Sequence, residues 1–406
     1  MTKTTQYKNT SIGPIPTDWE VKKLGEVTLG KGTYGINASA VIYSEELPKY
    51  LRITDIDDEG YFSTEKLSSV DDPTSNEFFL NENDIVFVRT GSTTGKSYLY
   101  DSKDGQLVYA GFLIKFSINP SKANKYFIWS YTKSDKYNDW VSTFSQRSGQ
   151  PGLNSNEFAS LQIPLPPLPE QQKIAEVLST WDKAIQETDA IIKKLEARNK
   201  ALAFSLLTGK KRVKGFEDKE FKKSLANEVF KSVSIKNNPE DSVLLSATQE
   251  FGMIPRDMIE TRVTMPSGSL KTYKLVEKGD FVISLRSFQG GIEYSEYTGL
   301  VSPAYTVLKS INPINDDFYK YYFKSEDLIG RLSVAVIGIR DGKNISYDDF
   351  STIVLPNPSL EEQNVIAEIL NTANQEVKQY QQKLEALKLQ KKGLMQQLLT
   401  GKVRTV

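Results

Sequence analysis

The stretch PEQQKIAEVLSTWDKAIQETDAIIKKLEARNKALAFSLLTGK, residues 169–210, repeats its apolar side chains every seven residues. One set of positions is Ile174, Trp181, Thr188, Leu195 and Leu202, and a second set, four residues further on, is Leu178, Ile185, Ile192, Asn199 and Leu206. Together they form the narrow a/d stripe of a helix that pairs lengthwise with another helix. Glu170 suits the first turn of such a helix and Gly209 its end. The stretch therefore predicts a rod that spans roughly 50 Å from Ile174 to Leu206, at 1.5 Å per residue.

The same stripe returns 192 residues later. IAE occurs at 174–176 and at 366–368, and LLTGK occurs at 206–210 and at 398–402. The second stripe consists of Ile366, Ala373, Tyr380, Leu387 and Leu394, interleaved with Leu370, Val377, Leu384, Lys391 and Leu398. A single apolar stripe is usually the buried face of an ordinary core helix. Two narrow stripes of equal length instead favour two helices that contact each other.

The direction of this pair stays open on the residues alone. A parallel register would place Asn199 opposite Lys391 and Trp181 opposite Ala373, which matches polar with polar and large with small. An antiparallel register would place Trp181 near Lys391 and Asn199 near Ala373, a looser match. An internal duplication packed about a two-fold axis, however, makes equivalent helices antiparallel. The stripe favours parallel pairing and symmetry favours antiparallel pairing.

Two segments of different character precede the helices, residues 1–160 and 213–358. Both are rich in β-branched and aromatic residues with frequent Gly, Asn, Asp and Pro, which is typical of short strands joined by turns. The expected strands are DIVFVRTG (84–91), GFLIKFSINP (111–120), DFVISLRS (280–287) and AYTVLKSINP (304–313), and the expected short helices lie at 123–134 and 316–327. The landmarks match in order while most other residues differ. We therefore expect two heads of similar fold that present different recognition surfaces.

Composition removes several classes of enzyme. The 406-residue chain has no cysteine and no histidine, which excludes Cys and His nucleophiles, a His general base and zinc ligands other than carboxylates. The net charge is zero, and both heads are slightly acidic, with 17 basic and 20 acidic residues in 1–160 and 18 and 20 in 213–358. DNA binding would therefore depend on local patches. No apolar run is long enough to span a bilayer and no signal peptide is recognisable, so we expect a cytoplasmic protein.

Several segments together carry a family resemblance. They are the PLPEQ lead-in at 167–171, the IAEVL start at 174–178, the LLTGK end, the second copy of the frame, and the opening SIGPIPTDWEVKKLGEV at 11–27. With them the chain resembles the specificity subunit of type I DNA restriction–modification enzymes over essentially its whole length. Two signatures, their spacing and the order of domains make this resemblance specific.

The resemblance implies an α+β fold with a pseudo-two-fold internal repeat. Its segments would be a first target recognition domain at 1–160, a central helix at 161–212, a second target recognition domain at 213–358 and a distal helix at 359–406. Each recognition domain would read one half of a bipartite double-stranded DNA target. The helices would form an antiparallel coiled coil that sets the gap and docks two modification subunits.

The resemblance also implies a subunit without catalysis of its own. S-adenosylmethionine, ATP and Mg²⁺ would belong to the partners, which are the modification subunits and, in the full complex, the restriction subunits. The alternative is a coiled-coil adaptor that binds two proteins and no DNA. Zero net charge slightly favours that alternative, whereas loops rich in Arg and Gln disfavour it.

Catalytic motifs are weak or missing. TGSTTGKS at 90–97 resembles a phosphate-binding P-loop, but the spacing of its glycines is one residue short and the following residues favour a strand. A DNA methyltransferase would need an [ND]-P-P-[YFW] motif, which the chain lacks. DDEG (57–60) and VDDP (70–73) read as turns and not as nuclease carboxylates. We expect neither methylation nor cleavage by this chain, whereas the 90–97 loop with Lys96 suits a DNA phosphate.

Four loops carry the residue types that contact DNA. Arg and Lys read guanine, Asn and Gln read adenine, and Ser, Thr and backbone amides hold phosphates. The candidates in the first head are Arg89, Thr90, Ser92, Lys96, Gln146, Arg147, Ser148 and Gln150, and those in the second head are Ser284, Arg286, Ser287, Gln289, Arg340, Lys343 and Asn344. Any one of these residues could instead be an ordinary solvated or ion-paired loop side chain.

Overall fold

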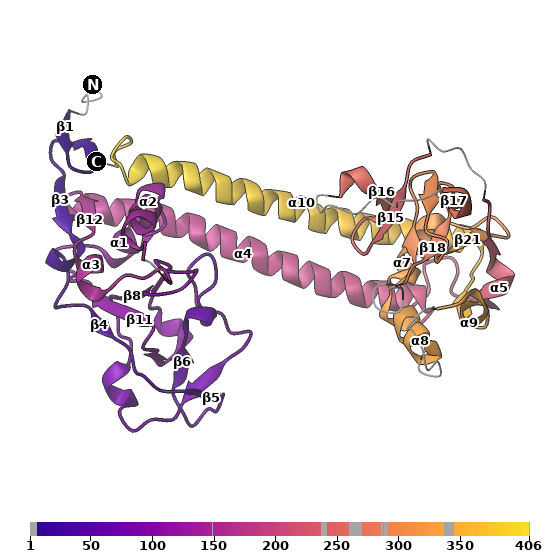
Figure 1. Cartoon of the computed structure of the whole chain (residues 1–406), viewed down its shortest axis with the longest axis horizontal. Helices are drawn as coiled ribbons and strands as arrows, with labels where there is room; N and C mark the ends of the chain where they lie inside the picture. Colours follow the sequence, from indigo (N-terminus) through magenta and orange to yellow (C-terminus); the bar gives the residue numbers. More distant parts are fainter. Residues whose placement is uncertain are drawn as a thin grey trace. The chain divides into compact units, whose positions relative to one another are not determined.

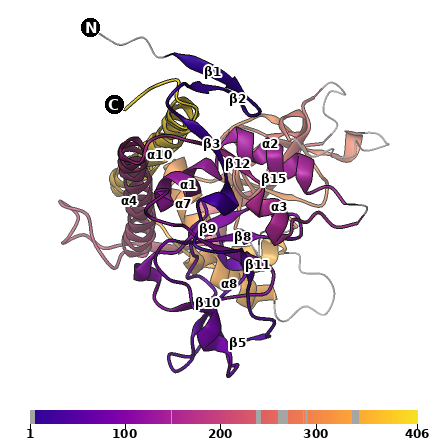
Figure 2. The same cartoon turned by 90° about the vertical axis from the view of Figure 1, so that its left-hand side faces the viewer.

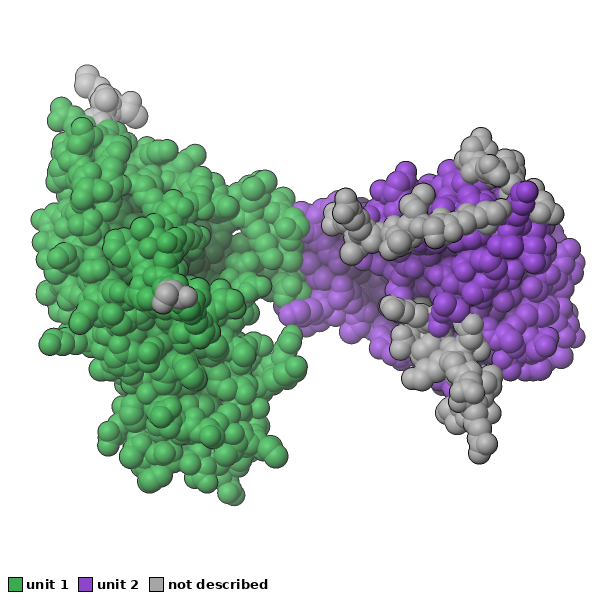
Figure 3. All heavy atoms as spheres, viewed as in Figure 1, with its two compact units in different colours: residues 1–189, 383–406 green, residues 190–382 purple. Residues whose placement is uncertain are grey.

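The computed structural model describes residues 6–147, 149–236, 242–259, 270–285, 287, 291–336 and 345–405. The chain forms two compact units, which are coloured separately in Figure 3. Unit 1 contains residues 1–189 and 383–406, and unit 2 contains residues 190–382. No helix in the described part of the chain is long and apolar enough to cross a membrane.

Two long helices run through the chain (Figure 1), as the heptad stripes predict. They are α4 (Leu168–Leu207) and α10 (Leu360–Leu398). Glu170 lies in the first turn of α4. Beyond the helix ends, Gly209 and Gly401 adopt φ angles of 73° and 69°, a left-handed conformation that glycine accepts without a steric penalty. All apolar members of both stripes are buried or half-buried.

In unit 1, the beginning of α4 lies beside the end of α10. Lys391 Nζ lies 2.5 Å from Asp182 Oδ1, and both side chains are about nine-tenths buried. Further along, Arg404 Nε donates to Glu170 Oε1 over 2.7 Å. An earlier residue of one helix thus contacts a later residue of the other, so the helices run antiparallel within this unit.

In unit 2, the end of α4 lies beside the beginning of α10 in the same antiparallel sense. Asn199 Nδ2 donates to Ala373 O over 2.8 Å and to Asn374 Oδ1 over 3.4 Å. Arg198 Nη2 lies 2.6 Å from Glu376 Oε2. The parallel alternative is therefore wrong, because Asn199 meets Ala373 and its neighbour and does not meet Lys391.

The head of unit 1 is built from small sheets and three short helices. Its central antiparallel sheet has the order β4 (Thr33–Tyr34), β11 (Leu113–Ser117), β8 (Asp84–Val88) and β9 (Ser97–Leu99). A second sheet has the order β10 (Leu107–Tyr109), β6 (Lys49–Leu51), β7 (Ser68–Val70) and β5 (Ala40–Ile42). The pairs β1 (Tyr7–Thr10) with β2 (Gly13–Pro16) and β3 (Glu20–Lys23) with β12 (Gln162–Leu165) complete it. The helices are α1 (Lys125–Tyr131), α2 (Asp135–Phe144) and α3 (Ser155–Ala159).

The head of unit 2 has the same kind of frame. Its central sheet has the order β14 (Phe230–Val233), β21 (Thr306–Ser310), β18 (Phe281–Ile283) and β19 (Glu293–Tyr294). The paired strands around it are β13 (Lys223–Leu225) with β22 (Val354–Pro356), β15 (Leu245–Thr248) with β16 (Gly252–Pro255), and β17 (Lys274–Val276) with β20 (Gly299–Val301). The helices are α5 (Ala226–Val229), α7 (Asp316–Phe323), α8 (Glu326–Val336) and α9 (Tyr347–Ser351).

These elements confirm the strands and short helices expected from the sequence in both heads. The strand stretches contain β8, β11, β18 and β21, and the helical stretches contain α1 and α7. Each head also shares its core with the long helices. In unit 1, Phe87 and Phe158 belong to the cluster that includes Leu178 of α4 and Leu398 of α10. In unit 2, the corresponding cluster joins aromatic residues of the head to Leu206 and Ile366.

The two junctions between helix and head are equivalent. In unit 2, Arg212 forms two bonds of 3.0 and 2.8 Å with the carboxylate of Glu362, which is 1% exposed. The equivalent pair in unit 1 is Arg404 with Glu170. Arg404 lies 192 residues after Arg212, and Glu170 lies 192 residues before Glu362 and is fully buried. The unit 1 junction joins the two ends of the chain, since Tyr7 Oη donates to Gly401 O over 3.0 Å beside the N-terminal hairpin (Figure 2).

Candidate nucleic-acid interface

In unit 1 the two loops that the sequence singles out lie side by side. The N–H of Gly91 donates to Pro151 O over 3.1 Å, and the N–H of Leu153 donates to Arg89 O over 2.8 Å. Thr90 and Gly152 form an isolated β-bridge between them. The loop after β8 and the loop after α2 therefore form one continuous surface at the end of the central sheet.

Most side chains on this surface are polar, and several of them are open to solvent. The guanidinium of Arg89 lies 4.9 Å from the ring centroid of Tyr34, whose side chain is exposed. Thr90 is half-buried, and Ser92, Gln146 and Gln150 are exposed. An arginine that an aromatic ring supports from one side keeps its N–H groups available for a base edge or a phosphate.

Two of the candidate cations already have carboxylate partners. Arg147 Nη2 lies 2.5 Å from Glu157 Oε1, and Arg147 Nη1 donates to the carbonyls of Phe144 and Gln146 over 3.0 and 2.9 Å. Lys96 Nζ lies 2.8 Å from Asp58 Oδ1 and donates to Ile56 O over 3.3 Å. These contacts fix both side chains at the rim of the surface. Ser148 lies outside the described residues.

In unit 2 the described candidates shape a turn. The N–H of Ser284 donates to Ser287 Oγ over 2.8 Å, directly after β18. Ser284 is 8% exposed and Ser287 is 1% exposed. Their hydroxyls hold the loop and are turned away from solvent. The remaining candidates of this head, which are Arg286, Gln289, Arg340, Lys343 and Asn344, lie outside the described residues.

Sequence reasoning missed one apolar residue of the surface. Phe112 is 58% exposed, and its carbonyl accepts the N–H of Arg89 over 3.1 Å. An exposed aromatic ring beside an arginine can stack on a base or act as a wedge between base steps. The single sequence signal was the bulky residue after Gly111, at the point where the chain enters β11.

The loop that resembles a P-loop leads into a strand, as expected. β9 begins at Ser97, directly after Lys96, so the helix N-terminus that a P-loop places on the phosphates is missing there. Among the described residues, no group of three or more potential ligand side chains is placed to hold a metal ion.

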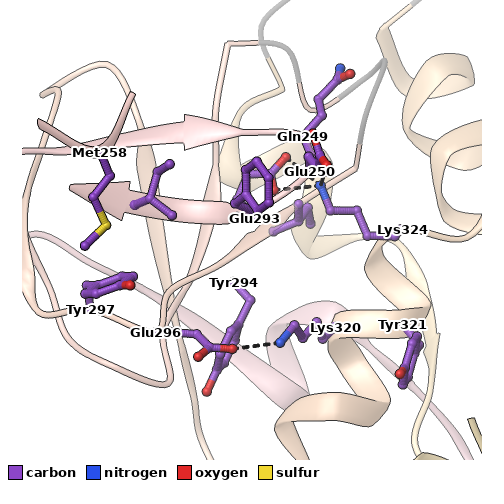
Figure 4. A pocket seen from close by; sticks show the side chains of 14 residues that line it. Gln249, Glu250, Met258, Glu293, Tyr294, Glu296, Tyr297, Lys320, Tyr321 and Lys324 are labelled. Carbon is purple, nitrogen blue, oxygen red and sulfur yellow. Dashed lines mark hydrogen bonds and ion pairs between the residues drawn. The ribbon is translucent and has the colours of Figure 1, made fainter. Parts of the chain in front are cut away.

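Unit 2 contains a cavity of about 710 Å³ between the β15–β16 hairpin and α7. Two ion pairs line it (Figure 4): Lys324 with Glu293, and Lys320 with Glu296. Burial raises the pKa of Glu293, and the hydrogen bonds from Lys324 oppose that rise. Both lysines that line this cavity are thus paired with carboxylates of the same unit.

Comparison with known proteins identifies relatives along the whole chain. The family described as the type I restriction modification DNA specificity domain matches residues 16–197 and 218–389. The putative type I restriction enzyme MjaX specificity subunit of Methanocaldococcus jannaschii is 28% identical over 99% of this chain and 97% of its own. The MjaVIII specificity subunit of the same organism is 29% identical over 96% of this chain and 94% of its own.

Solved structures share the fold at low identity. One is described as the structural basis underlying complex assembly and conformational transition of the type I R-M system; its TM-score is 0.56 at 16% identity, over 96% of this chain and 99% of that chain. Another is the type I restriction-modification system S subunit from M. genitalium, with a TM-score of 0.54 at 16% identity, over 94% and 96% of the two chains.

Proposed function

The chain belongs to the type I restriction–modification DNA specificity family, and from this premise we propose that its two heads each read a different half of one bipartite DNA site. The chain is a specificity subunit with two recognition domains and is not itself an enzyme. The observation that carries the proposal is the double match, since the family domain covers one head and most of one long helix in each half of the chain. The adaptor alternative is not supported, because the matched family is a DNA specificity family.

In unit 1 we assign the half-site contact to the surface around Arg89, Thr90 and Gln150. Its support is the adjacency of the two loops and the exposure of their polar side chains. Arg147 and Lys96 would add contacts at the rim by exchanging or sharing their carboxylate partners. In unit 2 the assignment to the loops at 284–289 and 340–344 rests on the sequence. The domain boundaries at 160, 212 and 358 likewise stay predictions.

DNA and the other subunits of the complex are the partners of this chain. We assign two modification subunits to the two equivalent ends of the helix pair, because each unit offers the same junction of helix and head. Exposed apolar side chains on the long helices, among them Phe204 and Leu389, support such docking. S-adenosylmethionine, ATP and Mg²⁺ would act on the modification and restriction subunits. We further propose that the helices form a coiled coil whose length sets the gap between the half-sites.

Loss of one arginine should affect one half-site alone. Arg147→Ala is expected to relax recognition in one half of the target and Arg340→Ala in the other half, because the two residues belong to different heads. An arginine that reads a base bidentately contributes about 1–3 kcal/mol of discrimination. The measurement is the set of sites methylated by the complex that carries each variant. If both variants relaxed the same half, the assignment of one head to each half would be wrong.

Tight DNA binding should require the modification subunits. Both heads are slightly acidic, so the isolated chain is expected to bind duplex DNA poorly. In the complex, basic surfaces of the partners would add phosphate contacts, and both affinity and salt dependence should rise. Affinity measured between 50 and 200 mM salt, for the chain alone and in the complex, checks this. Tight and strongly salt-dependent binding by the chain alone would contradict it.

A further inference from the structure

Lys133 and Lys324 occupy corresponding positions in the two heads. Each lysine stands nine residues after the asparagine that caps the preceding helix, which is Asn124 for α1 and Asn315 for α7. The two asparagines are themselves equivalent, since their backbone N–H groups donate to glutamine side chains at matching places in α4 and α10. The two lysines can therefore be compared directly.

Lys324 has its counter-charge within unit 2. Its Nζ lies 2.6 Å from both carboxylate oxygens of Glu293, which is 2% exposed, and it donates to Gln249 O over 3.3 Å. Figure 4 shows the Lys324 side chain directed at Glu293. Three acceptors satisfy this ammonium, so it has no need of a ligand.

Lys133 has a buried ammonium without an acceptor in the described part of the chain. Its Nζ lies 3.7 Å from the ring centroid of Trp129 and 5.1 Å from that of Tyr61. Lysine normally buries its stem and exposes its charge, and here the charge is the buried part. Burial, with Lys391 nearby, lowers the pKa of Lys133 to about 7. The ring faces stabilise a cation, but they leave its N–H groups without the oxygen acceptors that a buried ammonium requires.

A polar cavity of about 440 Å³ adjoins Lys133 and is lined by the turn at 58–60, the loop at 92–97 and the start of α2. Within the described residues, the backbone N–H groups and the hydroxyls of Ser92 and Thr93 donate to no acceptor. The same loop forms the edge of the surface around Arg89. The cavity thus combines unused donors with an ammonium that has no hydrogen-bond acceptor among the residues that the structure describes.

Two of the carboxylates near the cavity have lysine partners. Asp58 binds Lys96 over 2.8 Å, and its own side chain is fully exposed. Glu59 lies 3.7 Å from Lys388 Nζ. Asp182, Glu59 and Asp57 attract the charge of Lys133, but in the described part of the chain none of them accepts a hydrogen bond from its Nζ. The N–H groups of this ammonium therefore favour an anion over a cation as the ligand of the cavity.

We propose that this cavity of unit 1 binds one phosphate group, held by Lys133 and by the amides and hydroxyls of Ser92 and Thr93. This rests on the proposed function and deepens it, because a backbone phosphate beside the half-site read by unit 1 is the ligand that the neighbouring surface would bring. The Lys133 ammonium leaves the face of Trp129 for the phosphate oxygens as the DNA binds. At Lys324 of unit 2 we expect no such site, because the carboxylate of Glu293 already binds the lysine ammonium.

The test compares Lys133→Met with Lys324→Met in the complex with modification subunits. Lys133→Met keeps the apolar stem on Trp129 and removes a charge without a partner, so its Tm should be unchanged or higher. Its affinity for the duplex target should fall about 10-fold, as for a lost charged hydrogen bond. The slope of log K against log salt should become shallower by about 0.9, the value for one phosphate. Lys324→Met strands Glu293, so its Tm should fall while the slope stays unchanged.

Two further arms identify the source of the phosphate. With ¹³C-methylated lysines, the duplex should raise the pKa of Lys133 in the complex. A neutral methylphosphonate at one linkage of the duplex should weaken binding by the wild type but not by Lys133→Met. If inorganic phosphate alone raised that pKa and the duplex did not, the cavity would be a phosphate site for a free anion. If neither did, or if Lys133→Met bound duplex with wild-type slope and affinity, the proposal would be overturned. Sequence-specific methylation by that same variant would show that the proposed function stands independently.

Discussion

Deleting seven residues from each long helix is expected to shorten the gap between the two half-sites by about three base pairs and to leave the half-sites unchanged. Residues 187–193 of α4 and 380–386 of α10 are suitable, because their loss leaves the contacts of Asp182 with Lys391 and of Asn199 with Ala373 in place. Seven residues keep the a/d stripe in phase. They remove about 10 Å of helix at 1.5 Å per residue, and one base pair occupies about 3.4 Å.

Methylation by this variant should be weaker than by wild type. Three base pairs also turn the second half-site by roughly 100° about the DNA axis, whereas removing a heptad turns a helix by about 20°. The control deletes three or four residues from one helix, which puts its stripe out of register and should unfold the pair. The measurement is the methylated site of each variant. An active double deletion with the wild-type gap would mean that the helices do not set the spacing.

Replacing the arginine of either junction is expected to destabilise its own unit by about 3–5 kcal/mol. Arg404→Ala leaves the carboxylate of Glu170 buried, with the indole N–H of Trp19 at 3.0 Å as a remaining donor. Arg212→Ala does the same to Glu362 in unit 2. A buried charge without its counter-ion is costly, whereas an exposed pair contributes little. Hydrogen exchange resolved along the chain measures each unit separately.

Two controls separate charge burial from loss of packing. Arg331→Ala breaks a partly exposed pair on α8, in which the side chains of Arg331 and Asp327 are 47% and 22% exposed. It should change stability by less than about 0.5 kcal/mol. Glu170→Gln combined with Arg404→Ala removes the stranded charge and should recover part of the loss. Equal effects of Arg404→Ala and Arg331→Ala would contradict the account of the junctions.

Periodicity predicted the frame of the molecule well, because it depends on local sequence. A heptad stripe specifies a helix without reference to its partner, and the bounds of α4 and α10 follow from Pro before them and Gly after them. Stretches rich in β-branched and aromatic residues likewise predicted β8 and β11. Each of these elements is confirmed by the structure.

The direction of the helix pair could not be read from the stripe. Matching Asn199 with Lys391 assumed that polar stripe residues pair with each other. In the structure each has a different partner: Asp182 for Lys391, and the Asn374 side chain with the Ala373 carbonyl for Asn199. In unit 1 this layer is the buried ion pair of Lys391 with Asp182, and in unit 2 the equivalent layer is the amide pair of Asn199 with Asn374. Buried polar residues of this kind can fix register.

The candidate site depended on contacts between distant residues. The sequence named the loops of unit 1, but their adjacency arises from the bridge between Thr90 and Gly152. It could not reveal that Glu157 holds Arg147, since the pair requires α3 to pack beside the loop. Ser284 and Ser287 looked like phosphate ligands, yet serine hydroxyls readily bond to nearby backbone and so shape turns.

Recognition of one bipartite target by the two heads is tested most directly by a map of methylated adenines in the genome of the host, with and without this gene. If the two heads read one bipartite target, the map contains one site that is methylated only when the gene is present. That site consists of two different short half-sites separated by a fixed gap of unspecified bases. An unchanged map after deletion of the gene, or loss of a single uninterrupted site, would contradict it.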